Sequence, residues 1–270
     1  MILFSLLKIL VAAILPVGTI ASAEPDRLQG TPNFIQTDQE GTFPGGGKEY
    51  CGPVAASNTF VWLSKRGFPN LSPNSGDPKG DQISMIKTLG SNKYMQTNLV
   101  DGTGVNNFLD GVGKYIHDCS YQYSSLQYEG CRKNSSKYPT VADKPSLRDI
   151  KLSLDGKSGV WLNIGWYKFD AKTNSYKRTG GHWVTVVGAG VSNSGQNAPN
   201  TIIIHDPSSR TCPDRLPEFL QLEELLDGQM SGKNDNAQRS ARGYYKIAAG
   251  MKISKKVDAA IIDGAVILKM

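Results

Sequence analysis

Three apolar runs in the second half of the chain constrain its fold more than any other feature. They are GVWLNIGWYKF (159–169), HWVTVVGAG (182–190) and TIIIHD (201–206), and residues that form turns separate them. Valine, isoleucine, tryptophan and tyrosine are enriched in β-strands. Runs of this length and composition therefore predict consecutive strands of an antiparallel sheet.

Helical patterns precede these strands. Apolar residues recur at helical spacing, and the ranges expected to be helical are 53–67, 81–89, 104–116 and 146–155. The first of these begins at Pro53, and proline is tolerated in the first turn of a helix. The last begins with Ser146 and Asp149 in the spacing of a capping box. Helices followed by an antiparallel sheet indicate an α+β fold.

The ends of the chain carry further predictions. Residues 215–228 have a helical pattern, and AAIIDGAVIL (259–268) places Asp263-Gly264 between apolar runs, which is typical of a β-hairpin. Residues 24–50 are expected to be extended and to end in a flexible loop, Pro44-Gly45-Gly46-Gly47. The sequence shows no internal repeat and no break in composition, so residues 24–270 are expected to form one domain.

The first 23 residues have the pattern of a signal peptide. An apolar stretch, MILFSLLKILVAAILPVGTI (1–20), is followed by Ala21-Ser22-Ala23, a small-x-small cleavage signal. We expect export to the periplasm or secretion, with cleavage after Ala23, and an uncleaved membrane anchor is the alternative. Beyond this leader no stretch is long and apolar enough to span a bilayer, so no other membrane contact is expected.

Charge and cysteine content narrow the functional classes. The formal net charge is +6 without a lysine or arginine tract, so nucleic acid is not an expected partner. The oligomeric state is not indicated. Of the four cysteines, Cys119 and Cys131 are close in sequence and are expected to form a disulfide. Cys51 and Cys212 then either pair with each other or stay free. No cysteine or histidine spacing indicates a metal site.

Cys51 lies at the start of the first predicted helix, shortly after the glycine-rich loop. A thiolate is favoured at a helix N-terminus, where unpaired N–H groups present positive potential. A nucleophilic cysteine also needs an imidazole nearby in space to take up its proton. The chain has three histidines, and His117, in a polar stretch, is expected on the surface.

The other two histidines lie in the predicted strands. His182 begins one strand behind two glycines, whereas His205 and Asp206 end the next strand. Side chains alternate along a strand, so His205 and Asp206 point to opposite faces and only one of them can serve a given site. We expect Asp206 to accept a hydrogen bond from His182 Nδ1 and to fix its tautomer.

In this arrangement the chain resembles the papain-like cysteine peptidases, most of all the branch that processes bacteriocin leaders. The matching segments are Tyr50-Cys51-Gly52-Pro53, Gly181-His182-Trp183-Val184 and Ile204-His205-Asp206-Pro207, and the resemblance covers residues 32–208. It implies a helical part, with the nucleophile at a helix N-terminus, packed on an antiparallel sheet. It also implies a glutamine donor to the oxyanion. Gln36, in a Pro-x-x-x-Gln run, matches that position, although it lies 15 residues before Cys51, and Gln39 is the alternative.

These residues lead to a functional hypothesis. An exported cysteine peptidase or amide hydrolase would use Cys51, His182 and Asp206 as a triad, through a thioester intermediate, on a peptide or amide substrate. It would need neither a metal nor an organic cofactor. Two alternatives remain open: an acyltransferase with the same triad, and a binding or inhibitory module on a papain-like fold.

Overall fold

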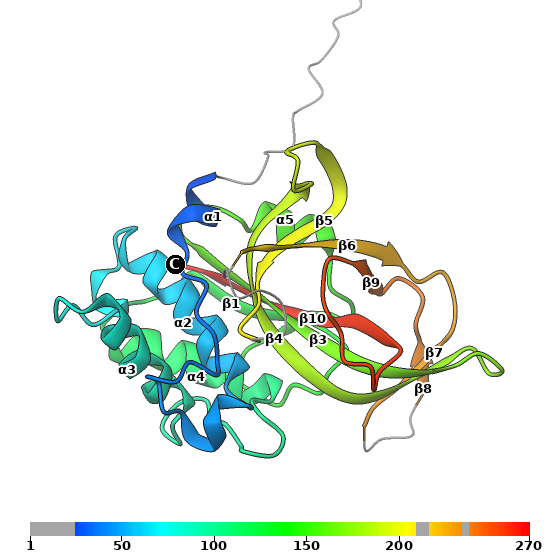
Figure 1. Ribbon diagram of the computed structural model, residues 1–270, viewed down its shortest axis with the longest axis horizontal. Helices are drawn as coiled ribbons and strands as arrows, with labels where there is room; N and C mark the ends of the chain where they lie inside the picture. Colours follow the sequence, from blue (N-terminus) through cyan, green and yellow to red (C-terminus); the bar gives the residue numbers. More distant parts are fainter. Residues whose placement is uncertain (1–24, 209–215, 234–237) are drawn as a thin grey trace, which may run out of the picture.

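The computed structural model describes residues 25–208, 216–233 and 238–270 (Figure 1). Helices α2, α3 and α4 gather on one side of the molecule, and the strands form a large curved sheet on the other (Figure 1). This arrangement of helices and sheet is compatible with the expected α+β class. The helices are α1 (Pro25–Gly30), η1 (Pro44–Gly47), α2 (Cys51–Ser64), η2 (Pro69–Leu71), α3 (Pro78–Gly90), α4 (Val105–Asp118) and α5 (Leu147–Leu152).

The strands come mostly from the second half of the chain. They are β1 (Ser125–Gly130), β2 (Thr140–Ala142), β3 (Ser158–Asp170), β4 (Ser175–Val191), β5 (Asn197–His205), β6 (Glu218–Glu224), β7 (Gln229–Ser231), β8 (Gln238–Ser240), β9 (Tyr245–Ala249) and β10 (Ala259–Lys269). The expected strands correspond to β3, β4 and β5, and the expected helices to α2, α3, α4 and α5. Ser146 caps α5 as predicted, since its hydroxyl accepts a hydrogen bond from the Asp149 N–H at 3.2 Å.

Six of the strands close into a ring. Antiparallel pairings join β3 to β4, β4 to β5, β5 to β6, β6 to β9, β9 to β10 and β10 back to β3. Strands β1 and β2 extend the sheet beyond β10, and β7 and β8 extend it beside the first residues of β4. Closure of this kind leaves few unpaired strand edges.

The ring separates two hydrophobic cores. Alternate residues of β3 and β4, such as Leu162 and Val184, pack inside the ring with side chains from the other four strands. Trp161 and Trp183 point to the opposite face and pack against α2 and α4. Trp161 Nε1 donates a hydrogen bond to the Ala55 carbonyl oxygen of α2 at 3.0 Å. The sheet therefore fixes the position of α2, and with it that of Cys51.

Two predicted elements are wrong. The helix expected over 215–228 is the strand β6, whose Leu220 and Leu222 point into the ring while Gln221 between them is exposed. The hairpin expected over 259–268 is one continuous strand, β10. Its Asp263-Gly264 pair forms a bulge instead of a turn, since the register with β3 shifts there. The bulge lets the Asp263 carboxylate enter the protein interior, where it is completely buried.

The segment before Cys51 is less extended than expected. It contains α1 and η1, and Gly45, Gly46 and Gly47 all have positive φ, at 62°, 66° and 75°. At Gly47 a Cβ atom would lie 1.6 Å from the Gln36 carbonyl oxygen, so only glycine fits this turn. The glycines thus form a compact turn that leads the chain into α2.

The expected signal peptide and its cleavage site lie outside the described residues. Among the helices of the described part, none combines the length and the apolar composition that a membrane span requires.

Candidate active site

Cys51 is the first residue of α2 and lines a cavity of about 1000 Å³. The first helical hydrogen bond runs from the Val54 N–H to the Tyr50 carbonyl, so the Cys51 and Gly52 N–H groups precede the helical ladder. Gly52 lies close to the loop before α4, where a Cβ atom would be 2.9 Å from the Thr103 side chain. Cys51 is 8% exposed, at the base of the cavity.

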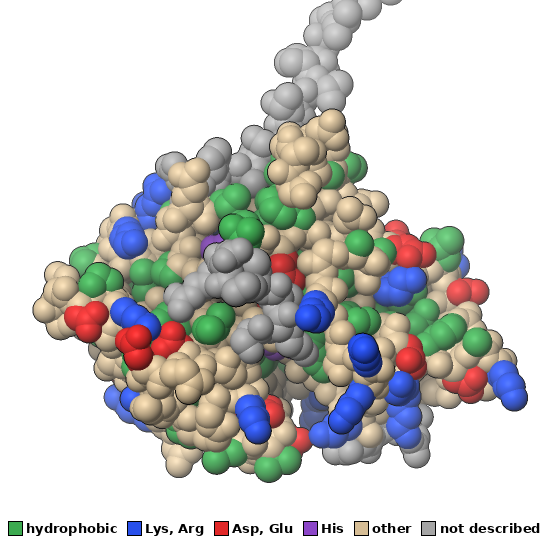
Figure 2. Space-filling view, viewed as in Figure 1, with side chains coloured by type: hydrophobic (Ala, Val, Ile, Leu, Met, Phe, Trp, Pro, Cys, Tyr) green, Lys and Arg blue, Asp and Glu red, His purple; other side chains and the backbone are tan. Residues whose placement is uncertain are grey.

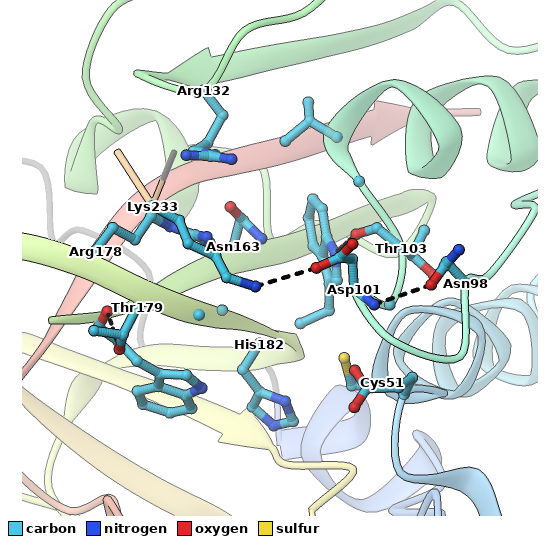
Figure 3. A pocket seen from close by; sticks show the side chains of 18 of the residues that line it. Cys51, Asn98, Asp101, Thr103, Arg132, Asn163, Arg178, Thr179, His182 and Lys233 are labelled. Atoms are coloured by element: carbon cyan, nitrogen blue, oxygen red, sulfur yellow. Dashed lines mark hydrogen bonds and ion pairs between the residues drawn. The ribbon is translucent and has the colours of Figure 1, made fainter. Parts of the chain in front are cut away.

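His182 of β4 lies next to Cys51, near enough for the two side chains to interact. In Figure 3 both side chains point into the same part of the cavity. His182 Nε2 forms a hydrogen bond of 2.5 Å with Asp206 Oδ1. Asp206 thus contacts Nε2, and the expected contact with Nδ1 is wrong. Since Nε2 is engaged by the carboxylate, Nδ1 is the nitrogen available to Cys51.

The surroundings of His182 favour its charged form. Burial disfavours the imidazolium, but the adjacent Asp206 carboxylate, its hydrogen bond to the imidazole and the neighbouring Cys51 side chain outweigh burial and raise the pKa of His182 to about 10. The Ser208 N–H donates to Asp206 Oδ1 at 2.7 Å and helps to hold the carboxylate. Trp166 of β3 stacks on the imidazole, with ring centroids 5.8 Å apart and planes at 22°.

The remaining histidines lie away from Cys51. His205, on β5, is buried and its Nδ1 bonds to the Pro32 carbonyl oxygen at 2.9 Å. His117 is at the end of α4, with its side chain 75% exposed. His205 and the neighbouring Asp206 therefore serve different contacts, as strand alternation predicts.

Gln36 lines the same cavity but is not arranged as an oxyanion donor. Its Nε2 donates hydrogen bonds to the carbonyl oxygens of Gly47 and Lys48, at 2.9 and 2.5 Å. An amide nitrogen carries two hydrogens, and both are engaged in holding the glycine turn. The alternative, Gln39, is exposed, does not line the cavity and donates a hydrogen bond to the Thr37 carbonyl. The Cys51 and Gly52 N–H groups at the start of α2 are then the backbone donors that the nucleophile's own helix offers to an oxyanion.

The expected disulfide between Cys119 and Cys131 is absent, and Cys51, Cys119 and Cys131 are all free thiols. Cys119 directly follows α4 and packs against the helical core, whereas Cys131 follows β1 and packs against another cluster, beside Tyr244. Proximity in sequence does not bring them together because β1 lies between them. Cys212 lies outside the described residues.

The cavity also contains residues that the sequence did not single out. Charged residues line it, namely Lys48, Glu49, Asp101, Arg132, Lys133, Arg178, Lys233 and Arg239. Asn163 of β3 lies on its floor, and Trp166 covers His182. These residues come from strands and loops far apart in the sequence and carry no common motif.

No protein-family model matches the chain, and no curated protein matches it either. Within the described part of the chain, no group of three or more histidine, cysteine, aspartate or glutamate side chains is placed to hold a metal ion.

Proposed function

We propose that the protein is an exported cysteine peptidase or amide hydrolase of papain-like architecture, with Cys51 as nucleophile. The observation that carries the proposal is the chain of contacts from Cys51 to His182 to Asp206 at the base of a large cavity. A cysteine at a helix N-terminus, beside an imidazole that a carboxylate orients, has the parts that nucleophilic acyl transfer requires.

Each group has a role in the proposed reaction. The Cys51 sulfur, as thiolate, attacks the substrate carbonyl carbon, and the electron pair of the C=O bond moves to the oxygen. The Cys51 and Gly52 N–H groups donate hydrogen bonds to that oxyanion. His182, protonated on Nδ1, gives this proton to the leaving nitrogen as the C–N bond breaks, which leaves a thioester and a free amine.

Water completes the cycle. His182, now neutral, takes a proton from water as the water oxygen attacks the thioester carbonyl. The C–S bond breaks, the acid product leaves, and the thiolate–imidazolium pair is restored. Asp206 keeps the imidazole oriented through Nε2 in both steps, and the stack with Trp166 shields that hydrogen bond from solvent.

The test is cleavage of a peptide library, followed by mass spectrometry. Cys51→Ala is expected to lower the rate by at least about 10³-fold, as removal of a nucleophile does in related chemistry. The matched control is Cys131→Ser, because Cys131 is a free thiol that lines the same cavity without a histidine partner. It is expected to keep its activity. Equal cleavage by the wild type and Cys51→Ala would refute the proposal.

A further inference from the structure

Basic side chains outnumber acidic ones in the lining of the cavity. Six basic and two acidic side chains line it: Lys48, Arg132, Lys133, Arg178, Lys233 and Arg239, against Glu49 and Asp101. Glu49 precedes Cys51 by two residues, and Asp101 pairs with Lys233 at 3.1 Å. In Figure 3, Arg132, Arg178 and Lys233 lie together on the side away from Cys51. Figure 2 shows lysine and arginine side chains gathered to the lower right of centre, over the region where Figure 1 places β4, β7 and β8.

Arg178 is the innermost of these cations. Its Nε donates to Asp263 Oδ2 at 2.6 Å, and the same carboxylate accepts the Tyr167 hydroxyl at 2.5 Å. One of its terminal nitrogens lies against Gly181, where a Cβ atom would be only 2.2 Å from it. Gly181 directly precedes His182. The glycine therefore gives the guanidinium room to lie along β4, beside the residues of the proposed reaction.

The outer cations have no competing acid. Within the described residues, Arg132, Lys133 and Arg239 form no ion pair with an aspartate or glutamate. Arg239 donates to the Cys131 carbonyl, which fixes it at the cavity wall. Half-buried guanidinium groups without a carboxylate partner are strong donors for a carboxylate that enters the cavity.

Asn163 provides a second, independent indication of a ligand. It is 5% exposed on the floor of the cavity, and its Oδ1 has no hydrogen-bond partner. A buried amide oxygen without a partner costs free energy unless a bound group satisfies it. A peptide N–H is such a group, because it donates a hydrogen bond and lies along an extended substrate.

From these observations we infer that this part of the cavity, formed by Asn163, Arg178, Arg132, Lys133 and Arg239, binds a carboxylate-bearing peptide. The carboxylate faces the arginines, and a backbone N–H of the peptide donates to Asn163 Oδ1. The inference rests on the proposed function, since it identifies the substrate class of the same site. The carboxylate is either an acidic side chain or a free C-terminus, and both have the same chemistry toward arginine.

Binding is tested without turnover in the Cys51→Ala protein. Three acetylated peptides are compared by calorimetry at low salt: hexaglutamate amide, hexaglutamine with a free C-terminus, and hexaglutamine amide. At least one carboxylate-bearing peptide is expected to bind about tenfold or more tightly than the neutral one, and the affinity is expected to fall as salt rises. The first two peptides distinguish side-chain carboxylates from the terminal one.

The variant Arg132→Gln/Lys133→Gln is expected to weaken that binding about fivefold to tenfold. The matched control, Lys252→Gln/Lys255→Gln, removes the same charge at two exposed lysines outside the cavity and is expected to change it less than twofold. Equal binding of all three peptides, an equal loss in the control, or tighter binding of a hexathymidylate would overturn the inference. Because no reaction is measured, failure of the peptidase activity is a separate result.

Discussion

Two buried histidines on neighbouring strands behave in opposite ways. His182 on β4 and His205 on β5 are 5% and 3% exposed, so burial does not distinguish them. His182 faces a carboxylate, and the pKa of its imidazole rises to about 10. His205 faces only the Pro32 carbonyl, and burial lowers its pKa to about 4. The charge of the partner, and not the depth of burial, decides which histidine stays protonated.

The contacts of both histidines come together at the end of β5. His205 attaches the N-terminal segment to this strand through Pro32, and the Gln36 N–H adds a hydrogen bond to the Pro207 carbonyl at 2.8 Å. Asp206 lies between these two anchors and points to His182. The neutral histidine therefore belongs to the scaffold that holds the carboxylate, and the charged one belongs to the proposed reaction.

The largest effect that follows from this comparison is a loss of catalytic activity when His182 is replaced. His182→Ala is expected to lower kcat/KM for a cleaved peptide by about 10³-fold or more, because it removes the proposed acid and base. His205→Gln is expected to stay within about threefold of the wild type, since glutamine can still donate to the Pro32 carbonyl. Steady-state kinetics on both variants measures the difference. A similar loss of kcat/KM in both variants would contradict the separate roles of His182 and His205.

The second effect concerns stability in acid. The pKa of His205 is about 4 in the folded protein and 6.5 when unperturbed, so the unfolded chain binds more protons between these values. The free energy of unfolding is therefore expected to fall by up to about 3 kcal/mol as pH drops from 6.5 to 4. Urea titrations at several pH values test this.

His205→Gln is expected to remove most of that pH dependence, because glutamine does not titrate. His117→Gln is the matched control, since His117 is exposed, and it is expected to retain the wild-type dependence. An identical pH dependence in His205→Gln and the wild type would show that His205 is not the titrating group.

The smallest effect on activity is expected from replacing Asp206, whose carboxylate contacts His182 but not His205. Asp206→Asn removes the charge that keeps His182 protonated, so the pKa of His182 is expected to fall. Above neutral pH this leaves less imidazolium to stabilise the thiolate. We expect kcat/KM to fall about 10-fold to 100-fold, with the alkaline limb of its pH profile at lower pH than in the wild type. If the alkaline limb of the pH profile did not move, Asp206 would not be the group that keeps His182 protonated.

Much of the fold follows from local patterns in the sequence. The strands β3, β4 and β5 have β-branched and aromatic residues in runs that no helix would favour, and α2 begins shortly after the glycine turn. The helix expected over 215–228 is wrong because pairing with β5 and β9 overrides its local preference. Asp263-Gly264 resembles a turn locally, but Arg178 and Tyr167 stabilise its carboxylate in the interior.

Part of the candidate site could also be predicted from local patterns in the sequence. Cys51 begins α2 and Asp206 directly follows β5, as their places at the ends of predicted elements suggest. His182 was expected to begin its strand, but it lies within β4, where it pairs with Ile164 of β3. The choice of Nε2, the engagement of the Gln36 amide and the separation of Cys119 from Cys131 depend on side-chain geometry between distant segments. The cationic part of the cavity comes from four separate segments, so no spacing in the sequence reveals it.

The rate of alkylation of each cysteine by iodoacetamide at pH 6, resolved by peptide mass spectrometry, tests the central claim most directly. Cys51 is the most buried of the three free cysteines in the described part of the chain, so exposure alone predicts the slowest reaction there. Burial raises the pKa of Cys119, and that of Cys131 to about 11. We predict that Cys51 reacts at least about 100-fold faster than Cys119 and Cys131, and that His182→Ala removes this difference. A Cys51 that reacts no faster than Cys119 in the native protein would contradict the account.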